Sequence, residues 1–217
     1  MSLPLAIAAV ACLIAYLLGS IPTGYLAGKW LQDIDIREHG SGSTGATNVL
    51  RTLGKKAAIT VLLCDAFKGM TGILLVKLLF AHREWIAMPA NFYDWMIVGA
   101  ALGAIIGHSK SIFLGFQGGK SVATSIGVLL VMTPFVALGT LAAFGIAIGI
   151  SQIVSLSSIS GAIAVMVFML VFQKPLPYIL FGVFASAYVI WRHRTNIERI
   201  LAGTEPKVGK KLSQKNS

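Results

Sequence analysis

The hydrophobic residues of this chain form long uninterrupted runs, not the alternating or striped patterns of soluble strands and helices. A helix needs roughly 20 apolar residues to cross a bilayer. Seven runs qualify as candidate spans: residues 3–28, 56–80, 93–110, 120–135, 134–150, 157–173 and 175–192. The middle runs are short and crowded around Pro134. The pattern therefore predicts an all-α membrane protein, a polytopic bundle of about seven transmembrane helices.

Composition supports this interpretation. The chain is 56% hydrophobic and 12% charged, whereas a soluble domain carries roughly 25% charged residues. We expect a single integral membrane domain over residues 1–217, with a short basic tail from about 200–217. Cys12 and Cys64 lie inside apolar runs, which argues against a disulfide framework. No Lys or Arg precedes the first run, so we expect a retained span and not a secretory signal.

The net charge of +10 could indicate nucleic-acid binding, but the cations lie at the edges of the apolar runs, where they set orientation. With the N-terminus outside, segments 29–56, 108–120, 151–157 and the tail from 192 face the cytoplasm. These segments hold 14 of the 18 Lys and Arg residues, three others face outward and Lys68 lies within a run. The asymmetry predicts an outer N-terminus and a cytoplasmic C-terminus, with the main polar segments on the cytoplasmic face.

The first polar segment reads REHGSGSTGATNVLRTLGKK, residues 37–56. Its glycines allow turns that other residues resist, and successive turn amides can converge on an anion. The Ser, Thr and Asn side chains add donors, and Arg51 can contact a phosphate through two hydrogen bonds. Composition alone leaves two interpretations open, an anion-binding loop and a flexible connection between helices.

The second segment reads GHSKSIFLGFQGGKSVATSIGVLL, residues 107–130. Gly118 and Gly119 lead into Lys120 where an apolar helix is predicted to begin, and a helix N-terminus attracts phosphate. A nucleotide-binding P-loop is excluded, since that pattern requires a glycine where Leu114 stands. The alternative for Lys120 is a lysine that extends its ammonium from a span end into water. His108 taken alone is more typical of an interfacial histidine than of a catalyst.

The third segment reads WRHRTNIERILAGTEP, residues 191–206. His193 and Asn196 share a face if this stretch is helical, and histidine can move protons near neutral pH. For the arginines Arg192, Arg194 and Arg199 we favour contact with anionic lipid head groups.

Two smaller polar features lie within or beside the apolar runs. Asp65 and Lys68 are three residues apart in the second run and can form an ion pair. The serines of SLSS, residues 155–158, stand at the start of the sixth run, where one can cap the helix. Another of these serines could contact a substrate.

The order and spacing of the three segments resemble the bacterial acyl-phosphate:glycerol-3-phosphate acyltransferases, the PlsY family. The matching stretches are SGSTGATNVLR, FLGFQGGKSVAT and HRTNIER followed by GTEP. The resemblance implies transfer of a fatty acyl group from acyl-phosphate to the 1-hydroxyl of glycerol 3-phosphate, giving lysophosphatidic acid and inorganic phosphate. This is the first acylation step of phospholipid synthesis. It implies a multi-pass enzyme of the bacterial inner membrane with a cytoplasmic active site. The implied partners are glycerol 3-phosphate, long-chain acyl-phosphate and membrane lipid, with no nucleic acid, cofactor or metal.

The resemblance also implies roles for individual residues. It gives four catalytic residues: Lys120, His193, Asn196 and Arg51. It gives a larger set that binds substrate: Ser41, Gly42, Thr47, Asn48, His108, Gly118, Gly119, Ser157, Ser158, Gly203 and Glu205. The chain departs from the family at Ser43, where Asn is usual, and at Ser121, where Gly is usual.

Acyl-phosphate is already activated, so the protein needs mainly to orient the hydroxyl and stabilise developing charge. We therefore expect direct attack without an acyl-enzyme, with His193 or a substrate phosphate as the base. Two other functions stay open on sequence alone. One is a transporter of organic anions, since broken glycine-rich spans suit such proteins. The other is a noncatalytic membrane scaffold.

Overall fold

The computed structural model describes residues 3–86 and 88–208, and this part of the chain contains helices and no strand. The α-helices are α1 (Leu3–Ser20), α2 (Thr23–Gln32), α3 (Ala46–Thr52), α4 (Lys55–Ala81), α5 (Tyr93–Ser109), α6 (Val122–Met132), α7 (Pro134–Ser151), α8 (Val154–Val171), α9 (Leu176–Arg192) and α10 (Arg194–Leu201). Short 3-10 turns cover Ile36–Glu38, Ala90–Phe92 and Ile112–Leu114. The predicted all-α class is confirmed.

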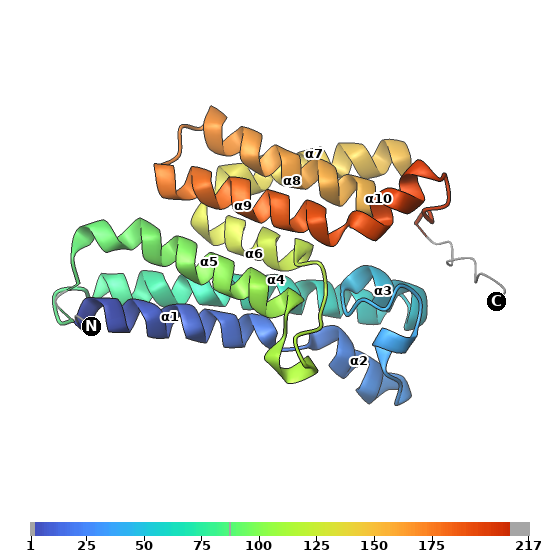
Figure 1. Ribbon diagram of the computed structural model, residues 1–217, viewed down its shortest axis with the longest axis horizontal. Helices are drawn as coiled ribbons and strands as arrows, with labels where there is room; N and C mark the ends of the chain where they lie inside the picture. The colour runs from blue at the N-terminus through green and yellow to red at the C-terminus, as the bar shows by residue number, and fades with distance from the viewer. Residues whose placement is uncertain (1–2, 87, 209–217) are drawn as a thin grey trace.

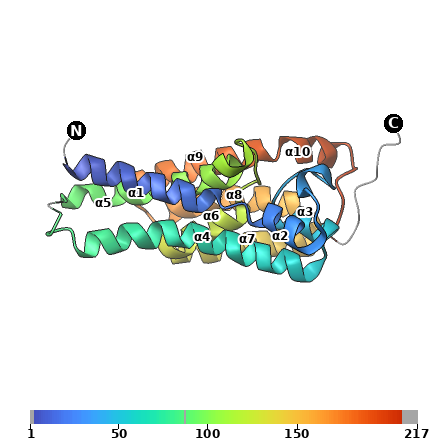
Figure 2. The same cartoon turned by 90° about the horizontal axis from the view of Figure 1, so that it is seen from below.

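The long helices run side by side, and the short helices α2, α3 and α10 gather at one end of the bundle (Figures 1 and 2). Helix α1 packs against α4 and α5, α6 joins α4 to α7, and α8 lies between α7 and α9. Helix α1 begins at one end of the molecule, whereas α10 lies at the opposite end (Figure 1). The bundle therefore has a polar end, where the loops 33–45 and 110–121 meet α10.

Each predicted span corresponds to a helix, but their lengths differ. Within the described ranges 3–86 and 88–208, five segments are long and apolar enough to cross a membrane: Leu3–Gln32, Lys55–Ala81, Ala90–Ser109, Pro134–Ser151 and Val154–Val171. The apolar helices α6 and α9 are shorter. The first predicted span, 3–28, is interrupted after Ser20, because Pro22 has no amide hydrogen to continue the helix. The Ile21 carbonyl next to this break accepts a 2.8 Å hydrogen bond from Lys68 Nζ.

The predicted serine cap of the sixth run is wrong. Helix α8 starts after Ile153 without a side-chain cap. The hydroxyls of Ser157 and Ser158 instead donate to the carbonyls four residues earlier, at 2.9 Å each. The predicted ion pair is confirmed, with Lys68 Nζ 2.8 Å from Asp65 Oδ1.

Small residues bring the helix backbones into close contact. Gly99, Gly103 and Gly107 recur every four residues on the side of α5 that faces α1. A methyl group on Gly107 would overlap the Tyr16 carbonyl, and one on Gly103 would lie 2.8 Å from the Cys12 carbonyl oxygen. Lipid offers no hydrophobic advantage to helix association, so close packing of such small residues supplies much of the attraction. This packing fixes α5, and with it the start of the loop that carries Lys120.

We expect Gly107→Ala to lower the free energy of unfolding by about 1–3 kcal/mol, the usual cost of overpacking a tight contact. Gly145→Ala in α7 is the matched control, because a methyl group there would meet nothing within 4 Å. Thermal unfolding of both variants in the same detergent measures the difference. Equal midpoints for the two variants would contradict the proposed close contact.

Candidate active site

The glycine-rich loop before α3 is built around the side chain of Asn48. Its Oδ1 accepts from the Ser41 amide at 2.8 Å, while its Nδ2 donates to the carbonyls of Ile36 at 3.1 Å and His39 at 2.9 Å. Gly40 has φ of 59°, and a methyl group there would overlap Asn48 Oδ1, so a larger residue fits neither the backbone nor the space. Both amide hydrogens of Asn48 are used inside the loop. The structure therefore makes Asn48 a loop-building residue.

The loop and α3 leave several donors facing a cavity. Ser41, Thr47 and Arg51 line it, and within residues 3–86 and 88–208 neither hydroxyl nor the guanidinium forms a hydrogen bond. Burial lowers the pKa of Arg51 from its ordinary value, yet a guanidinium stays charged at neutral pH. These groups are free to bind an anion.

The Gly118–Lys120 segment lies between α5 and α6 and is held from two sides. The Gly119 amide donates to the His108 carbonyl at 3.2 Å. From α9, the Arg192 guanidinium donates to the Gly118 carbonyl at 3.2 Å and the Gly119 carbonyl at 2.9 Å. A methyl group on Gly119 would overlap the His108 ring, so only glycine fits here. These contacts fix the backbone from which the Lys120 side chain extends.

Ser121 explains one departure from the family pattern. Its φ of 62° lies in the left-handed region, which costs an ordinary residue roughly 1–2 kcal/mol. The buried hydroxyl donates to the Ile105 carbonyl at 2.7 Å, which offsets part of that cost. The other departure, Ser43, forms a turn in which its hydroxyl accepts from the Gly45 amide at 3.3 Å.

The Lys120 ammonium donates to Oδ1 of Asn196. The Asn196 amide in turn donates to Glu205 Oε1 at 2.7 Å. Glu205 also accepts from Ser155 Oγ at 2.8 Å and from Arg199 Nε at 2.6 Å. A relay of hydrogen bonds thus joins the lysine to a carboxylate.

Burial affects the charges of this relay. It tends to raise the pKa of Glu205, but the hydrogen bonds from Asn196, Arg199 and Ser155 outweigh it, so the pKa is lowered and the carboxylate is ionised. Burial, joined by the positive charge of Arg199, lowers the pKa of Lys120 to about 8. Lys120 therefore remains mostly protonated at pH 7.

His193 lies where α9 ends and α10 begins. Its Nδ1 is 2.7 Å from the Val189 carbonyl oxygen. Because a carbonyl can only accept, Nδ1 carries the hydrogen and Nε2 keeps its lone pair. Burial lowers the pKa of His193 to about 4, so the ring is neutral at physiological pH.

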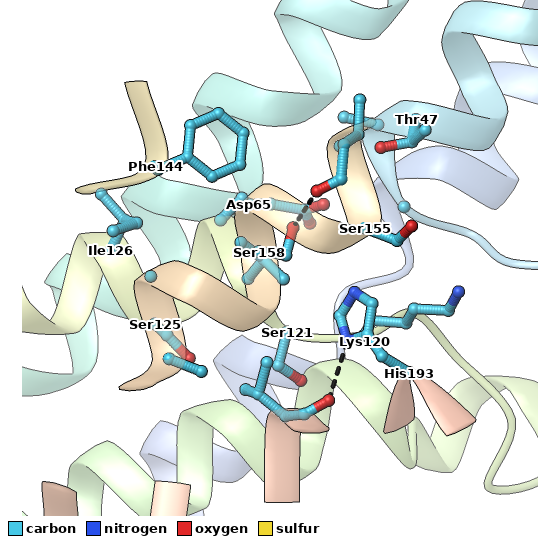
Figure 3. Close-up of a pocket in the computed structure, with 18 of the residues that line it drawn as sticks. Thr47, Asp65, Lys120, Ser121, Ser125, Ile126, Phe144, Ser155, Ser158 and His193 are labelled. Atoms are coloured by element: carbon cyan, nitrogen blue, oxygen red, sulfur yellow. Dashed lines mark hydrogen bonds between the residues drawn. The ribbon is translucent and has the colours of Figure 1, made fainter. Parts of the chain in front are cut away.

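These groups surround one cavity of about 450 Å³ (Figure 3). Its polar end includes Ser41, Arg51, Lys120 and His193, and its other end is lined by apolar side chains of α6 to α9, among them Leu130, Phe144, Val165 and Phe181. Figure 3 shows Lys120 and His193 on one side of the view, with Ile126 and Phe144 on the other. A smaller pocket of about 160 Å³ adjoins the polar end and shares Ser41, Ser43 and Lys120 with it.

Most of the predicted site residues meet here. The cavity is lined by Ser41, Thr47, Asn48, Arg51, His108, Lys120, Ser158, His193, Asn196 and Glu205. Gly42 and Gly118 line the smaller pocket. Neither pocket is lined by Gly119, which contacts His108, by Ser157, or by Gly203, which forms the turn after α10 with φ of 68°.

Several site residues escaped the sequence interpretation. Ser155, one of the serines that the sequence left open as a substrate contact, lines the cavity and binds Glu205, a link that the sequence did not indicate. Arg192 and Arg194, which we had assigned to lipid head groups, line the smaller pocket together with Thr195. Arg199 binds Glu205 within the chain. The sequence did contain one indication of their role, the several arginines close to His193. Such a group of arginines is as typical of an anion-binding site as of a lipid-contacting surface.

Residues 9–203 match the family model described as glycerol-3-phosphate acyltransferase. The chain belongs to this family. A glycerol-3-phosphate acyltransferase of Crocosphaera subtropica is 58% identical over 211 residues, which cover 97% of this chain and 98% of that protein. Another from Rippkaea orientalis is 60% identical over 209 residues, covering 96% of each chain.

Two crystal structures of PlsY, an integral membrane glycerol 3-phosphate acyltransferase, share the fold of this acyltransferase. The glycerol 3-phosphate form gives a TM-score of 0.83 and the lysophosphatidic acid form 0.79. Each is 35% identical and covers 94% of this chain and 96% of the PlsY chain. The protein is thus a PlsY-type membrane acyltransferase of phospholipid synthesis, which decides against the transporter and the scaffold.

The left-handed conformation at position 121 leads to a stability prediction. Ser121→Ala keeps the backbone strain and loses the hydrogen bond, so we expect a loss of about 1 kcal/mol in unfolding free energy. Ser121→Gly loses the same bond but removes the strain, so its stability should lie within about 1 kcal/mol of the parent chain. Thermal unfolding of the two variants tests the order, and an alanine variant more stable than the glycine variant would contradict it.

Proposed function

We propose that this acyltransferase takes its acyl group from acyl-phosphate and transfers it to the 1-hydroxyl of glycerol 3-phosphate. The products are lysophosphatidic acid and inorganic phosphate. The observation that carries the proposal is the division of the cavity into a cationic end and an apolar end. An acyl-phosphate has the same division, with a charged phosphate on a long apolar chain.

The smaller pocket supports two phosphate-bearing substrates. Arg192 and Arg194 line it, whereas Arg51 lines the large cavity, and Lys120 borders both. Two anions bound in the two pockets would therefore meet at Lys120. A cation between two phosphates lessens their repulsion and allows the hydroxyl to approach the acyl carbonyl.

The acyl transfer proceeds by direct attack without an acyl-enzyme. The 1-hydroxyl oxygen forms a bond to the acyl carbon, and the bond from that carbon to the phosphate oxygen breaks. Negative charge develops on the carbonyl oxygen and on the departing phosphate, where Lys120 and Arg51 can stabilise it. The hydroxyl proton passes to Nε2 of His193 or to a substrate phosphate. A phosphate with pKa near 6 is the stronger base, since burial lowers the pKa of His193 to about 4.

In the membrane, we propose seven crossings: α1, α4, α5, α6, α7, α8 and α9. The excess of basic residues supports a cytoplasmic position for the polar end, with the start of α1 on the outer side of the bacterial inner membrane. Ends of α1 and α10 on opposite sides of the bundle fit an odd number of crossings (Figure 1). The active site then faces water-soluble glycerol 3-phosphate, while the apolar end of the cavity lies among lipid-embedded helices.

Phosphate release tests the donor. Purified protein in lipid should release phosphate from palmitoyl-phosphate only when glycerol 3-phosphate is also present, with lysophosphatidic acid formed in equal amount. Lys120→Ala should lower the rate by about 100-fold or more, the usual cost of losing a group that stabilises transition-state charge. Transfer from palmitoyl-CoA with palmitoyl-phosphate inert would overturn the choice of donor.

The pH dependence of kcat tests the charge on Lys120. With a pKa of about 8, the ammonium loses its charge as the pH rises through 8, so kcat should fall above that pH. In Lys120→Arg the remaining activity should persist to higher pH, because a guanidinium stays charged. If kcat of the parent and of Lys120→Arg fell at the same alkaline pH, the fall would have to come from the titration of another group.

A further inference from the structure

A buried cluster of ionisable side chains lies beside the cavity, on the side formed by α4 and α5. It consists of Asp65 and Lys68 from α4 and His108 from α5, which are 1%, 6% and 6% exposed. The sequence assigned the first two to a structural ion pair and His108 to substrate binding. The cavity is lined by Asp65 and His108 but not by Lys68.

The contacts of Asp65 join three parts of the fold. Its Oδ1 accepts from Thr23 Oγ1 at 2.6 Å and lies 2.8 Å from Lys68 Nζ and 3.3 Å from His108 Nδ1. Lys68 continues to the Ile21 carbonyl at the break between α1 and α2. The carboxylate thus connects that break to the ring of His108.

His108 connects this cluster to the loop that carries Lys120. Its carbonyl accepts from the Gly119 amide at 3.2 Å, and its ring packs against Gly119, where the absence of a side chain leaves room for Nε2. Position 119 is therefore in contact with both the backbone and the ring of His108. The ring therefore packs directly against the residue immediately before Lys120.

We infer that Asp65 is a positioning residue for Lys120 that acts through His108. The carboxylate faces the Nδ1 side of the ring at 3.3 Å, the Nε2 side packs against Gly119, and this packing fixes the segment from which Lys120 reaches Asn196. This inference rests on the proposed role of Lys120 in acyl transfer. It gives the buried ion pair a part in the reaction that is separate from holding the helices together.

An experiment can distinguish a purely structural role of the Asp65–Lys68 pair from the positioning role of Asp65. The distinction is possible because a buried ion pair often adds little to stability. Removing both charges together is commonly neutral or stabilising, whereas removing one leaves an unpaired buried charge. The variant Asp65→Leu/Lys68→Met removes both charges, leaves no acceptor facing the His108 ring and keeps similar volumes. It should fold with a melting temperature close to that of the parent chain.

The experiment compares kcat and thermal unfolding of this double variant with the parent, using palmitoyl-phosphate and glycerol 3-phosphate. We expect kcat to fall by about tenfold or more, since small misplacements of a catalytic group have effects of this order. Adding His108→Gln should cause no further loss, because the two changes interrupt the same connection. An unchanged kcat in the double variant would overturn the inference. So would a further fall in kcat on adding His108→Gln, because the two changes would then act independently.

Lys77→Met is the matched control. Lys77 is also in α4 and donates to a backbone carbonyl, that of Val131 at 2.8 Å, but it lies away from both pockets. Its variant should keep kcat within about twofold even where stability falls, as expected of a surface or packing change. If kcat of Lys77→Met falls in proportion to its loss of stability, the fall in kcat of the double variant is explained by impaired folding. That result would overturn the inference.

Gly119→Ala covers the case in which the double variant fails to fold. It leaves every charge in place and separates the loop from the His108 ring, so kcat should fall as in the double variant; full activity overturns the inference. Parent protein and Lys120→Ala are assayed alongside. An inactive parent or an active Lys120→Ala variant would mean that the proposed function is wrong. If the parent is active and Lys120→Ala is not, the result for the double variant tests the role of Asp65 alone.

Discussion

The arrangement of the site depends on the buried carboxylate of Glu205. It accepts hydrogen bonds from Ser155 of α8 and from Asn196 and Arg199 of α10, so it ties the last short helix to the bundle. The same contacts decide which way the Asn196 amide points. With its NH₂ group turned to the carboxylate, its oxygen must face Lys120. The lysine is therefore aimed by a neutral group, and its positive charge is not cancelled by a direct ion pair.

The membrane environment explains why the polar groups converge at one end. Apolar side chains serve both lipid-facing and core-facing positions along the spans, whereas charged groups inside the bilayer need partners. Asp65 and Lys68 satisfy this requirement with Thr23 and the carbonyl at the α1–α2 break. Four further cations, Arg51, Lys120, Arg192 and Arg194, border the two pockets, where an anionic substrate can supply a partner.

Much of this could be predicted from the sequence, because long apolar runs and glycine-punctuated polar segments are strong local signals. The pairing of Asp65 with Lys68 followed from helical spacing, and the family resemblance pointed to residues that now line one cavity. Which face of a fully apolar helix points inward could not be predicted. Ser155 and Ser158 share the cavity face of α8, while Ser157 differs from Ser155 by roughly 200° around the helix. The role of Arg192 was also hidden, since a cation at a span end looks the same whether it binds lipid or a loop carbonyl.

The position of Glu205 after α10 has a consequence for biogenesis. Helices α1 to α10 all precede it, so they can insert and pack before this carboxylate leaves the ribosome. Until then the Asn196 amide lacks its carboxylate partner, and its oxygen is not turned toward Lys120. The enzyme therefore gains its oriented lysine only after these helices have been made, and a chain truncated after α10 would occupy the membrane as an intact but inactive bundle.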